Sequence, residues 1–298
     1  MTADHSPPPP ARSEGSAIRD GRRLSWTRAG TGSPTVLFEA GIGASSSGWE
    51  LIFDRVAAFA TVIAYDRVGY GGSGEGEASP GAALLDLEEV LGNAGAGDPL
   101  VLVGHSWGGV LSRLYAAAHA ERVAAVVLVD ATHEGITLFT HPAMALLNRV
   151  AFAAQVRRAK RGRLRRSLEA GKGRLGTMLA GLPASMRNRL LDELSSPGTW
   201  EQAGREMRTV APALRSLSPE MPAVPVVAVV GTGGGKAERR ERAMIRSAYD
   251  AWLPTLDDGR LIEAPNSGHA VPQQDPDLLV EILRGLVEEM AARRVPSD

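Results

Sequence analysis

The sequence contains no cysteine. Disulfide bonds, thiolate metal sites and a cysteine nucleophile are therefore excluded. An excess of one charge is lacking as well, because 33 Lys and Arg residues stand against 34 Asp and Glu residues, for a formal net charge of −1. A chain without a basic excess gives no reason to expect nucleic acid as a partner.

Long apolar runs are also missing. No run approaches the roughly 20 apolar residues that a membrane-spanning helix needs, and the N-terminal stretch lacks the apolar centre of a signal peptide. Residues 1–16 contain a run of prolines and almost no apolar side chains, so they cannot bury enough surface to offset their ordering entropy. We therefore expect a disordered leader over residues 1–16 and a soluble, cytoplasmic protein.

The most informative stretch is G-H-S-W-G-G at residues 104–109. It follows an apolar run at residues 99–103 and precedes an alanine-rich run with helical spacing at residues 110–118. A strand, G-x-S-x-G and a helix in this order are typical of a nucleophile elbow, a sharp turn that raises one serine hydroxyl above the end of a sheet. Ser106 is therefore the candidate nucleophile. A serine hydroxyl is weak until a neighbouring base takes its proton, so a base is required.

Further runs rich in Val and Ile predict the strands of a parallel sheet. They lack polar alternation, as expected for strands that are buried on both faces, and helix-like stretches separate them. The predicted strands cover residues 24–27, 35–39, 60–65, 99–103, 123–129, 225–230 and 260–264. Functional groups in such sheets gather at the carboxyl ends of the strands, where the candidates below also lie.

The segment 133–221 has no strand pattern. Its helix-like stretches, interrupted by Gly and Pro, predict a helical cap inserted into a core formed by residues 17–132 and 222–298. We expect its large hydrophobic residues to form the core of the cap, although some must cover the pocket if the cap is a lid. These residues are Phe139, Met144, Leu146, Leu147 and Trp200.

The first half of the cap segment is strongly basic. We interpret this run as a solvated helix face, because the chain is neutral overall and no aromatic residues alternate with the arginines to stack on bases. Contact with a membrane surface would need apolar residues on the face opposite the basic residues, and the segment has a partial set of them. The basic residues are Arg157, Arg158, Lys160, Arg161, Arg163, Arg165, Arg166, Lys172 and Arg174, and the apolar ones are Ala151, Phe152, Ala154, Val156, Leu164 and Leu168.

His269 is the candidate base. It follows a short predicted strand, which places it at the carboxyl edge of the sheet, where it can reach Ser106. The unperturbed pKa of a histidine, about 6.5, suits proton transfer at neutral pH. His105 is too close in sequence to reach back to the serine, and His133 and His141 lie in or near the cap segment.

The third group is a carboxylate that orients the imidazole and stabilises its charged form. Asp130, at the end of the strand after the elbow helix, is our first candidate. The stretch after the next strand, residues 231–236, contains no carboxylate, so Glu238 is the second candidate and Glu134 the third. The alternative interpretation of Asp130 is a strand-end aspartate that caps the following turn.

An oxyanion site needs two backbone N–H groups. One is expected from Trp107, the residue after the nucleophile, and the other from Ile42 in the glycine-rich loop after the strand at 35–39. The alternative interpretation of this loop is an ordinary flexible turn. A phosphate-binding loop would need a following Lys-Ser/Thr pair, which is lacking. The set of candidate residues requires no metal ion and no organic cofactor.

Several stretches, in order along the chain, resemble motifs of the α/β-hydrolase superfamily. They are E-A-G-I-G at 39–43, D-R-V-G-Y-G-G-S at 66–73, G-H-S-W-G-G at 104–109 and G-H at 268–269. The resemblance implies an α/β fold with a mostly parallel, eight-stranded type of sheet flanked by helices, an inserted helical cap, and the triad order Ser106, Asp130, His269. The position of Asp130 is similar to that of the acid in haloalkane dehalogenases. Those enzymes use an aspartate nucleophile, so Ser106 argues against dehalogenase or epoxide hydrolase activity.

These residues predict a serine hydrolase that acts on a small or medium apolar carboxylic ester through an acyl-enzyme, with water as the second reactant. Hydrolysis of a lactone, thioester, amide or carbon–carbon bond is the next hypothesis. A protein of another class stays open, namely a ligand-binding or interaction protein without catalytic activity on a hydrolase scaffold. The presence of both Ser106 and His269 argues against that class.

Overall fold

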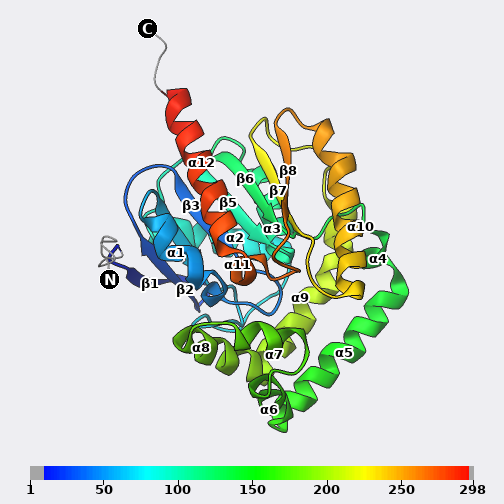
Figure 1. Cartoon of the computed structure of the whole chain (residues 1–298). Helices are drawn as coiled ribbons and strands as arrows, with labels where there is room; N and C mark the ends of the chain where they lie inside the picture. Colours follow the sequence, from blue (N-terminus) through cyan, green and yellow to red (C-terminus); the bar gives the residue numbers. More distant parts are fainter. Residues whose placement is uncertain (1–9, 295–298) are drawn as a thin grey trace, which may run out of the picture.

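A twisted sheet crosses the centre of the molecule in the computed structural model, which describes residues 10–294 (Figure 1). The strands are β1 Ser13–Arg19, β2 Arg22–Ala29, β3 Thr35–Glu39, β4 Thr61–Tyr65, β5 Leu100–His105, β6 Val123–Val129, β7 Val226–Gly231 and β8 Gly259–Ala264. Within the described residues they form one eight-stranded sheet in the order β1-β2-β4-β3-β5-β6-β7-β8. β2 pairs antiparallel with β1 and β4, and the other pairs are parallel. The predicted fold class is confirmed.

The first strand corrects the prediction for the N-terminus. Residues 13–16, which the composition assigned to a disordered leader, belong to β1 and pair with residues 25–28 of β2. Arg12 is also held, because its guanidinium donates two hydrogen bonds to Asp54 (2.7 and 2.9 Å). The expectation of disorder considered only the burial of apolar side chains. A strand at the sheet edge is also stabilised by backbone hydrogen bonds to its neighbour, which do not depend on apolar side chains. The rest of the predicted leader, residues 1–9, lies outside the described residues.

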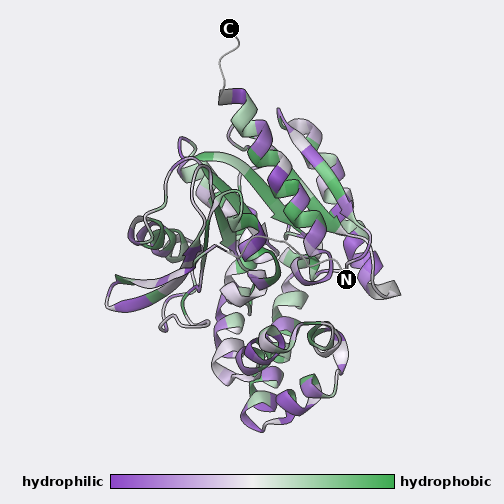
Figure 2. Ribbon diagram, turned by 60° about the vertical axis from the view of Figure 1, so that its left-hand side comes forward, coloured by the Kyte–Doolittle hydropathy of each residue, from purple (hydrophilic) through white to green (hydrophobic). Residues whose placement is uncertain are grey.

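Side-chain alternation along the strands divides the core into two layers. In β5, Leu100 and Leu102 face one layer, and Val101 and Val103 face the other. Helices α2 Pro80–Asn93, α3 Trp107–Ala118 and α10 Lys236–Trp252 cover the first layer, and α1 Glu50–Ala57 and α12 Pro276–Arg294 cover the second. Short helices η1 Ser46–Trp49, η2 Leu253–Thr255 and α11 Val271–Gln274 complete the core. Figure 2 shows the central strands as the most hydrophobic part of the ribbon, as expected when both faces are covered.

The chain leaves the sheet between β6 and β7 and forms a group of helices, called the cap below. They are α4 Thr137–Thr140, α5 Pro142–Lys160, α6 Arg163–Glu169, α7 Gly173–Ala180, α8 Ala184–Ser195 and α9 Pro197–Ser216. The cap buries a small core of its own around Leu168, Leu179 and Met186. Leu146 and Leu147, which we expected in that core, are instead 65% and 58% exposed on α5. The contact of α5 with α9 uses another residue, Phe152, which lies against Gly204 and Trp200.

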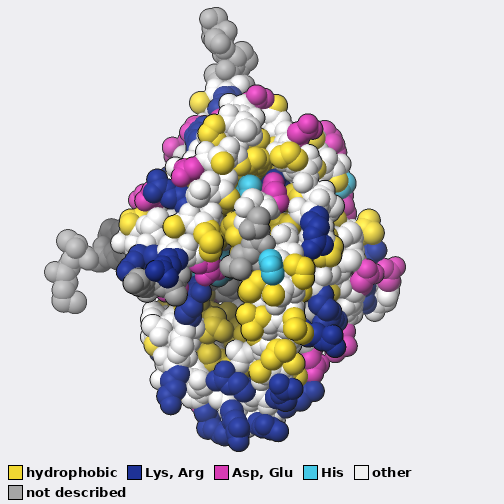
Figure 3. Space-filling model, turned by 90° about the vertical axis from the view of Figure 1, so that its right-hand side faces the viewer, with side chains coloured by type: hydrophobic (Ala, Val, Ile, Leu, Met, Phe, Trp, Pro, Cys, Tyr) yellow, Lys and Arg dark blue, Asp and Glu magenta, His cyan; other side chains and the backbone are white. Residues whose placement is uncertain are grey.

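The basic residues of the cap point outward. Figure 3 shows Lys and Arg side chains gathered at the lower end of the molecule. Arg157, Arg161 and Arg166 are among the exposed residues of the cap. Leu164 and Leu168, part of the apolar face considered for membrane contact, are buried in the cap core. None of the helices in the described part of the chain combines the length and the apolar character needed to cross a bilayer.

The close approach of β5 and α3 leads to a prediction about Gly104. A Cβ atom at this position would lie 2.5 Å from the carbonyl oxygen of Gly108 and 2.5 Å from Cα of Gly109. Gly104→Ala is therefore expected to lower the free energy of unfolding by about 1–3 kcal/mol, the usual cost of overpacking. Urea denaturation followed by circular dichroism measures the change.

Gly92→Ala is the matched control. Gly92 lies on α2 with open space where a Cβ would be added, and this substitution is expected to leave stability unchanged or raise it by about 0.5–1 kcal/mol. Equal unfolding midpoints for the two variants would contradict the prediction.

Candidate active site

The turn between β5 and α3 presents Ser106 at the carboxyl edge of the sheet. Its backbone has φ 55° and ψ −118°, a conformation that is rare for a residue other than glycine and that persists only when its surroundings enforce it. The Ser106 carbonyl accepts hydrogen bonds from the amides of Gly109 and Thr132 (both 3.1 Å). Gly108 lets the helix approach the sheet, since a Cβ there would lie 2.2 Å from the carbonyl oxygen of Glu39.

His269 and Asp130 meet although 139 residues separate them in the sequence. Asp130 follows β6 with a φ of 43° and has a fully buried side chain. Its Oδ2 lies 2.6 Å from Nδ1 of His269, and its Oδ1 accepts a hydrogen bond from the amide of Gly231 (3.2 Å). The carboxylate is thus oriented by the neighbouring strand and directed at the imidazole.

The two alternative carboxylates are bound by arginines. Glu134 forms a two-pronged ion pair with Arg113 (2.6 and 2.8 Å). Glu238 accepts a hydrogen bond from the amide of Gly235 (3.0 Å) and pairs with Arg174 (2.6 Å). Of the three candidate acids, Asp130 is the one whose carboxylate lies within hydrogen-bond distance of His269 in the described structure.

Arg242 of α10 is a member of the site that the sequence analysis did not identify. Its side chain is only 2% exposed, and its Nη1 pairs with Oδ2 of Asp130 and lies 2.9 Å from Nδ1 of His269. Its Nη2 pairs with Glu241 (2.6 Å). Other arginines at residues 239–246 surround it in the sequence, so no local pattern distinguishes the one that faces the site.

Arg242 affects the proton affinity of His269. Burial is the main cause that lowers the pKa of His269 from 6.5 to about 3, and the positive charge of Arg242 adds to it. The imidazole is therefore neutral at pH 7, as a proton acceptor must be. The two partners at Nδ1 favour different tautomers, because a protonated Nδ1 donates to Asp130, whereas an unprotonated Nδ1 accepts from Arg242. Only the first tautomer leaves Nε2 free to accept a proton.

His105, which we excluded as a base, supports the loop that carries His269. Its Nε2–H donates to the backbone carbonyl of His269 (2.8 Å), and the two rings lie 4.7 Å apart. Burial lowers the pKa of His105 to about 3, so this ring stays neutral and keeps one ring nitrogen as a donor.

Two adjoining cavities start at Ser106 and His269. The first has a volume of about 210 Å³ and is mostly apolar, and it is lined by Trp49 of the core and by Leu190 and Leu194 of the cap. The second has a volume of about 250 Å³. Its walls combine polar groups of the core with apolar groups of the cap, namely Asp130, Thr132, Arg242, Phe139, Phe152 and Met207.

The cap contributes aromatic side chains to these cavities. Trp200 lines both of them and Phe139 lines the second. Both residues also pack against buried clusters, Trp200 against the cap core and Phe139 against the cluster around Trp107. They therefore fit both parts of the expectation, which placed such residues in a packed core and some of them over the pocket. Hydropathy predicts that such residues avoid water, but it does not tell a cavity wall from a packed interior.

Ile42 and Trp107, the two expected amide donors, line the second cavity together with Ser106. Trp107 is the first residue of α3, so its N–H has no acceptor within the helix. In a planar trans peptide the N–H points opposite to the preceding carbonyl. Because the Ser106 carbonyl is held by Gly109 and Thr132, the Trp107 N–H points away from both.

Comparison with known proteins now identifies the family. Residues 36–282 match the alpha/beta hydrolase family. The match covers most of the sequence, and the chain belongs to this family.

Individual relatives are more distant. A haloalkane dehalogenase of Sphingobium indicum is 36% identical over 117 residues, which are 37% of this chain and 39% of that protein. The protein YqjL of Bacillus subtilis is 33% identical over 105 residues, 35% of this chain and 42% of that protein. The chain thus spans about two fifths of the length of these curated relatives. The Cif epoxide hydrolase of Acinetobacter nosocomialis superimposes with a TM-score of 0.73 at 17% identity, over 92% of this chain and 88% of that one, and therefore shares the fold.

The charge of Arg242 leads to a prediction for the pKa of His269. Arg242→Met removes a positive charge that disfavours the imidazolium form, so the pKa of His269 is expected to rise toward the usual value for histidine. Titration of the ring nitrogens by NMR measures the shift. Arg240→Met removes an exposed charge from the same helix and is expected to leave the pKa unchanged. A pKa in Arg242→Met equal to or below the wild-type value would contradict the prediction.

Proposed function

We propose that this protein is a serine hydrolase that cleaves a small or medium apolar carboxylic ester through an acyl-enzyme. The observation that carries the proposal is the 2.6 Å contact between Nδ1 of His269 and Asp130, at the sheet edge where Ser106 stands on its strained turn. A nucleophile, a neutral imidazole and a buried carboxylate at one edge are the groups that acyl transfer needs.

In the proposed reaction, Oγ of Ser106 bonds to the ester carbonyl carbon while Nε2 of His269 takes the serine proton. Asp130 stabilises the imidazolium, and the amides of Ile42 and Trp107 stabilise the oxyanion. The carbon–oxygen bond to the alcohol then breaks, and the alcohol leaves with the proton from His269. Water attacks the acyl-enzyme with His269 as the base, and the products are the carboxylic acid and free Ser106.

The two cavities support an ester with an apolar group on each side of the scissile bond. Since both cavities begin at Ser106, the acyl part and the alcohol part can lie in different cavities. The mostly apolar wall of the first favours a hydrocarbon group. The proposed reactants are accordingly a small acyl compound and water, with the basic outer end of the cap as a solvated surface.

We propose ester hydrolysis rather than the reactions named for the dehalogenase and epoxide hydrolase relatives. Position 106 holds a serine, whereas haloalkane dehalogenases, to which the position of Asp130 is similar, use an aspartate nucleophile. The similarity to the Sphingobium dehalogenase also covers only 37% of this chain. A shared fold supports many reactions, and the groups in the site decide between them.

The nucleophile is tested by Ser106→Ala. This substitution is expected to lower kcat for p-nitrophenyl butyrate by about 10³–10⁶-fold and to abolish covalent labelling by a fluorophosphonate probe. Ser185→Ala changes an exposed serine of the cap and is expected to keep wild-type turnover and labelling. Unchanged turnover in Ser106→Ala would refute the proposal, and reversible ester binding without any labelling of the wild type would favour a non-catalytic binding protein.

The acid is tested by three matched changes from carboxylate to amide. Asp130→Asn is expected to lower kcat by about 10⁴-fold, because the imidazole loses its orienting partner. Glu134→Gln and Glu238→Gln are expected to stay within a few-fold of wild type, since arginines outside the cavities bind these carboxylates. A larger loss in Glu238→Gln than in Asp130→Asn would show that the wrong carboxylate has been assigned.

A further inference from the structure

We propose that Arg67 is a positioning residue for the oxyanion site and that Glu206 of the cap helix α9 holds Arg67 in place. The inference rests on the proposed function, because it adds a part to the same site. Both side chains are about 3% exposed, and neither belongs to the candidate triad.

Arg67 binds the loop that contains Ile42. It follows β4 and lies beneath the segment that leaves β3. Its Nη1 donates a hydrogen bond to the carbonyl of Ala40, and its Nη2 donates one to the carbonyl of Gly41 (2.8 Å). One guanidinium thus holds two consecutive carbonyls of the loop, which a rigid fork of donors is suited to do.

The bond to Gly41 sets the direction of the Ile42 amide. The Gly41 carbonyl and the Ile42 N–H belong to one planar trans peptide and point in opposite directions. Because the carbonyl is directed at the buried guanidinium, the N–H is directed away from it, toward the side where Ile42 and Ser106 line the cavities. The loop also abuts the elbow, since a Cβ on Gly41 would lie 3.2 Å from Cβ of Ser106.

Two buried carboxylates compensate the charge of Arg67. Glu39, at the end of β3, accepts from Nη1 (2.6 Å), and Glu206 accepts from Nε and Nη2 (2.8 and 3.2 Å). Burial alone would lower the pKa of Arg67, but the attraction of Glu206 and Glu39 outweighs it and raises that pKa. The guanidinium is therefore charged at every physiological pH and forms strong hydrogen bonds to the loop carbonyls.

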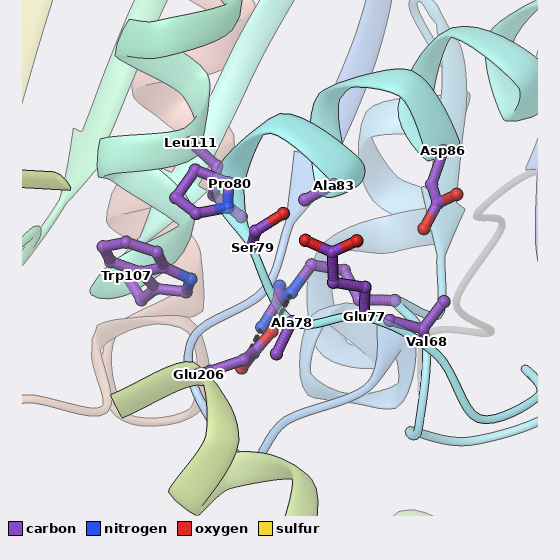
Figure 4. A pocket seen from close by; sticks show the side chains of 11 residues that line it. Val68, Glu77, Ala78, Ser79, Pro80, Ala83, Asp86, Trp107, Leu111 and Glu206 are labelled. Atoms are coloured by element: carbon purple, nitrogen blue, oxygen red, sulfur yellow. Dashed lines mark hydrogen bonds and ion pairs between the residues drawn. The ribbon is translucent and has the colours of Figure 1, made fainter. Parts of the chain in front are cut away.

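Tyr70 connects the same cap carboxylate to the next part of the loop. Its hydroxyl donates to Glu206 (2.7 Å) and accepts a hydrogen bond from the amide of Gly43 (3.1 Å). Glu206 therefore reaches the loop by two routes, through Arg67 and through Tyr70. Figure 4 shows Glu206 projecting from α9 toward the core, near Trp107 of α3.

This arrangement couples the cap to the oxyanion site. Glu206 is one of the two carboxylates that compensate Arg67, so a displacement of α9 would leave the guanidinium with Glu39 alone and release the Tyr70 hydroxyl. Such a cluster contributes little to the stability of the fold, because the attraction within a buried ion pair is largely offset by the cost of removing its charges from water. Holding the Ile42 N–H ready for a developing negative charge is a function that the cluster can perform.

The test uses Arg67→Lys, which keeps the charge but replaces the planar fork by a single ammonium. Such an ammonium cannot hold both carbonyls and both carboxylates. We expect kcat for p-nitrophenyl butyrate to fall by about 10–100-fold with KM changed less than about 3-fold, because an oxyanion donor acts mainly in the transition state. Glu206→Gln is expected to change the same constants in the same direction, by less.

Arg113→Lys is the matched control. Arg113 is also a buried arginine in a two-pronged ion pair, with Glu134, but it lines neither cavity. Its replacement by lysine is expected to cost similar stability without lowering kcat. An equal loss of kcat in Arg113→Lys would reduce the role of Arg67 to general stability and overturn the proposal.

Hydrogen exchange separates this proposal from the proposed reaction. The amides of Gly43 and Ala44 donate to Tyr70 and to Gly41, so their exchange, measured by NMR, reports the order of the loop. Faster exchange in Arg67→Lys and Glu206→Gln, but not in Arg113→Lys, supports the proposal, and unchanged exchange overturns it. A wild-type protein that no fluorophosphonate labels would refute the hydrolase function, whereas the exchange result would still decide whether Arg67 holds the loop.

Discussion

The alignment of parallel strands at one edge of the sheet is the constraint on which the site depends. In register, Glu39 of β3 lies opposite Gly104 of β5, and His105 of β5 lies opposite Val129 of β6. The segments that leave these strands are therefore neighbours, although they are far apart in the sequence. They carry Ile42, Ser106 and Asp130, and the loop after β8 adds His269.

Two buried guanidinium groups support this edge in different ways. Arg67 binds the loop that contains Ile42 and lies between two carboxylates that keep it charged. Arg242 lies behind His269, and burial lowers its own pKa to about 10. The first orients backbone carbonyls, and the second disfavours protonation of the imidazole. A buried charge is costly unless it is paired, so both arginines depend on carboxylates that other segments supply.

Membership of the alpha/beta hydrolase family defines the fold and leaves the reaction to the residues in the site. A haloalkane dehalogenase and an epoxide hydrolase are among the proteins that this chain resembles. The serine at position 106 is the feature that separates the proposed ester hydrolysis from those reactions. The cap contributes to the walls of the apolar cavity beside Ser106, because Leu190, Leu194 and Trp200 line it.

The sequence by itself determined the parallel sheet and the choice of Ser106, Asp130 and His269 as candidates, because buried strands and the elbow are local patterns of a few residues. It missed β1, whose polar residues 13–16 are ordered by pairing with β2. It also missed Arg242, Arg67 and Glu206. Arg67 and Glu206 are 139 residues apart, and an ion pair across such a distance leaves no periodic signal. Only the tertiary structure decided these contacts. A buried charge needs a partner of opposite charge close to it in space, and that partner can come from any part of the chain.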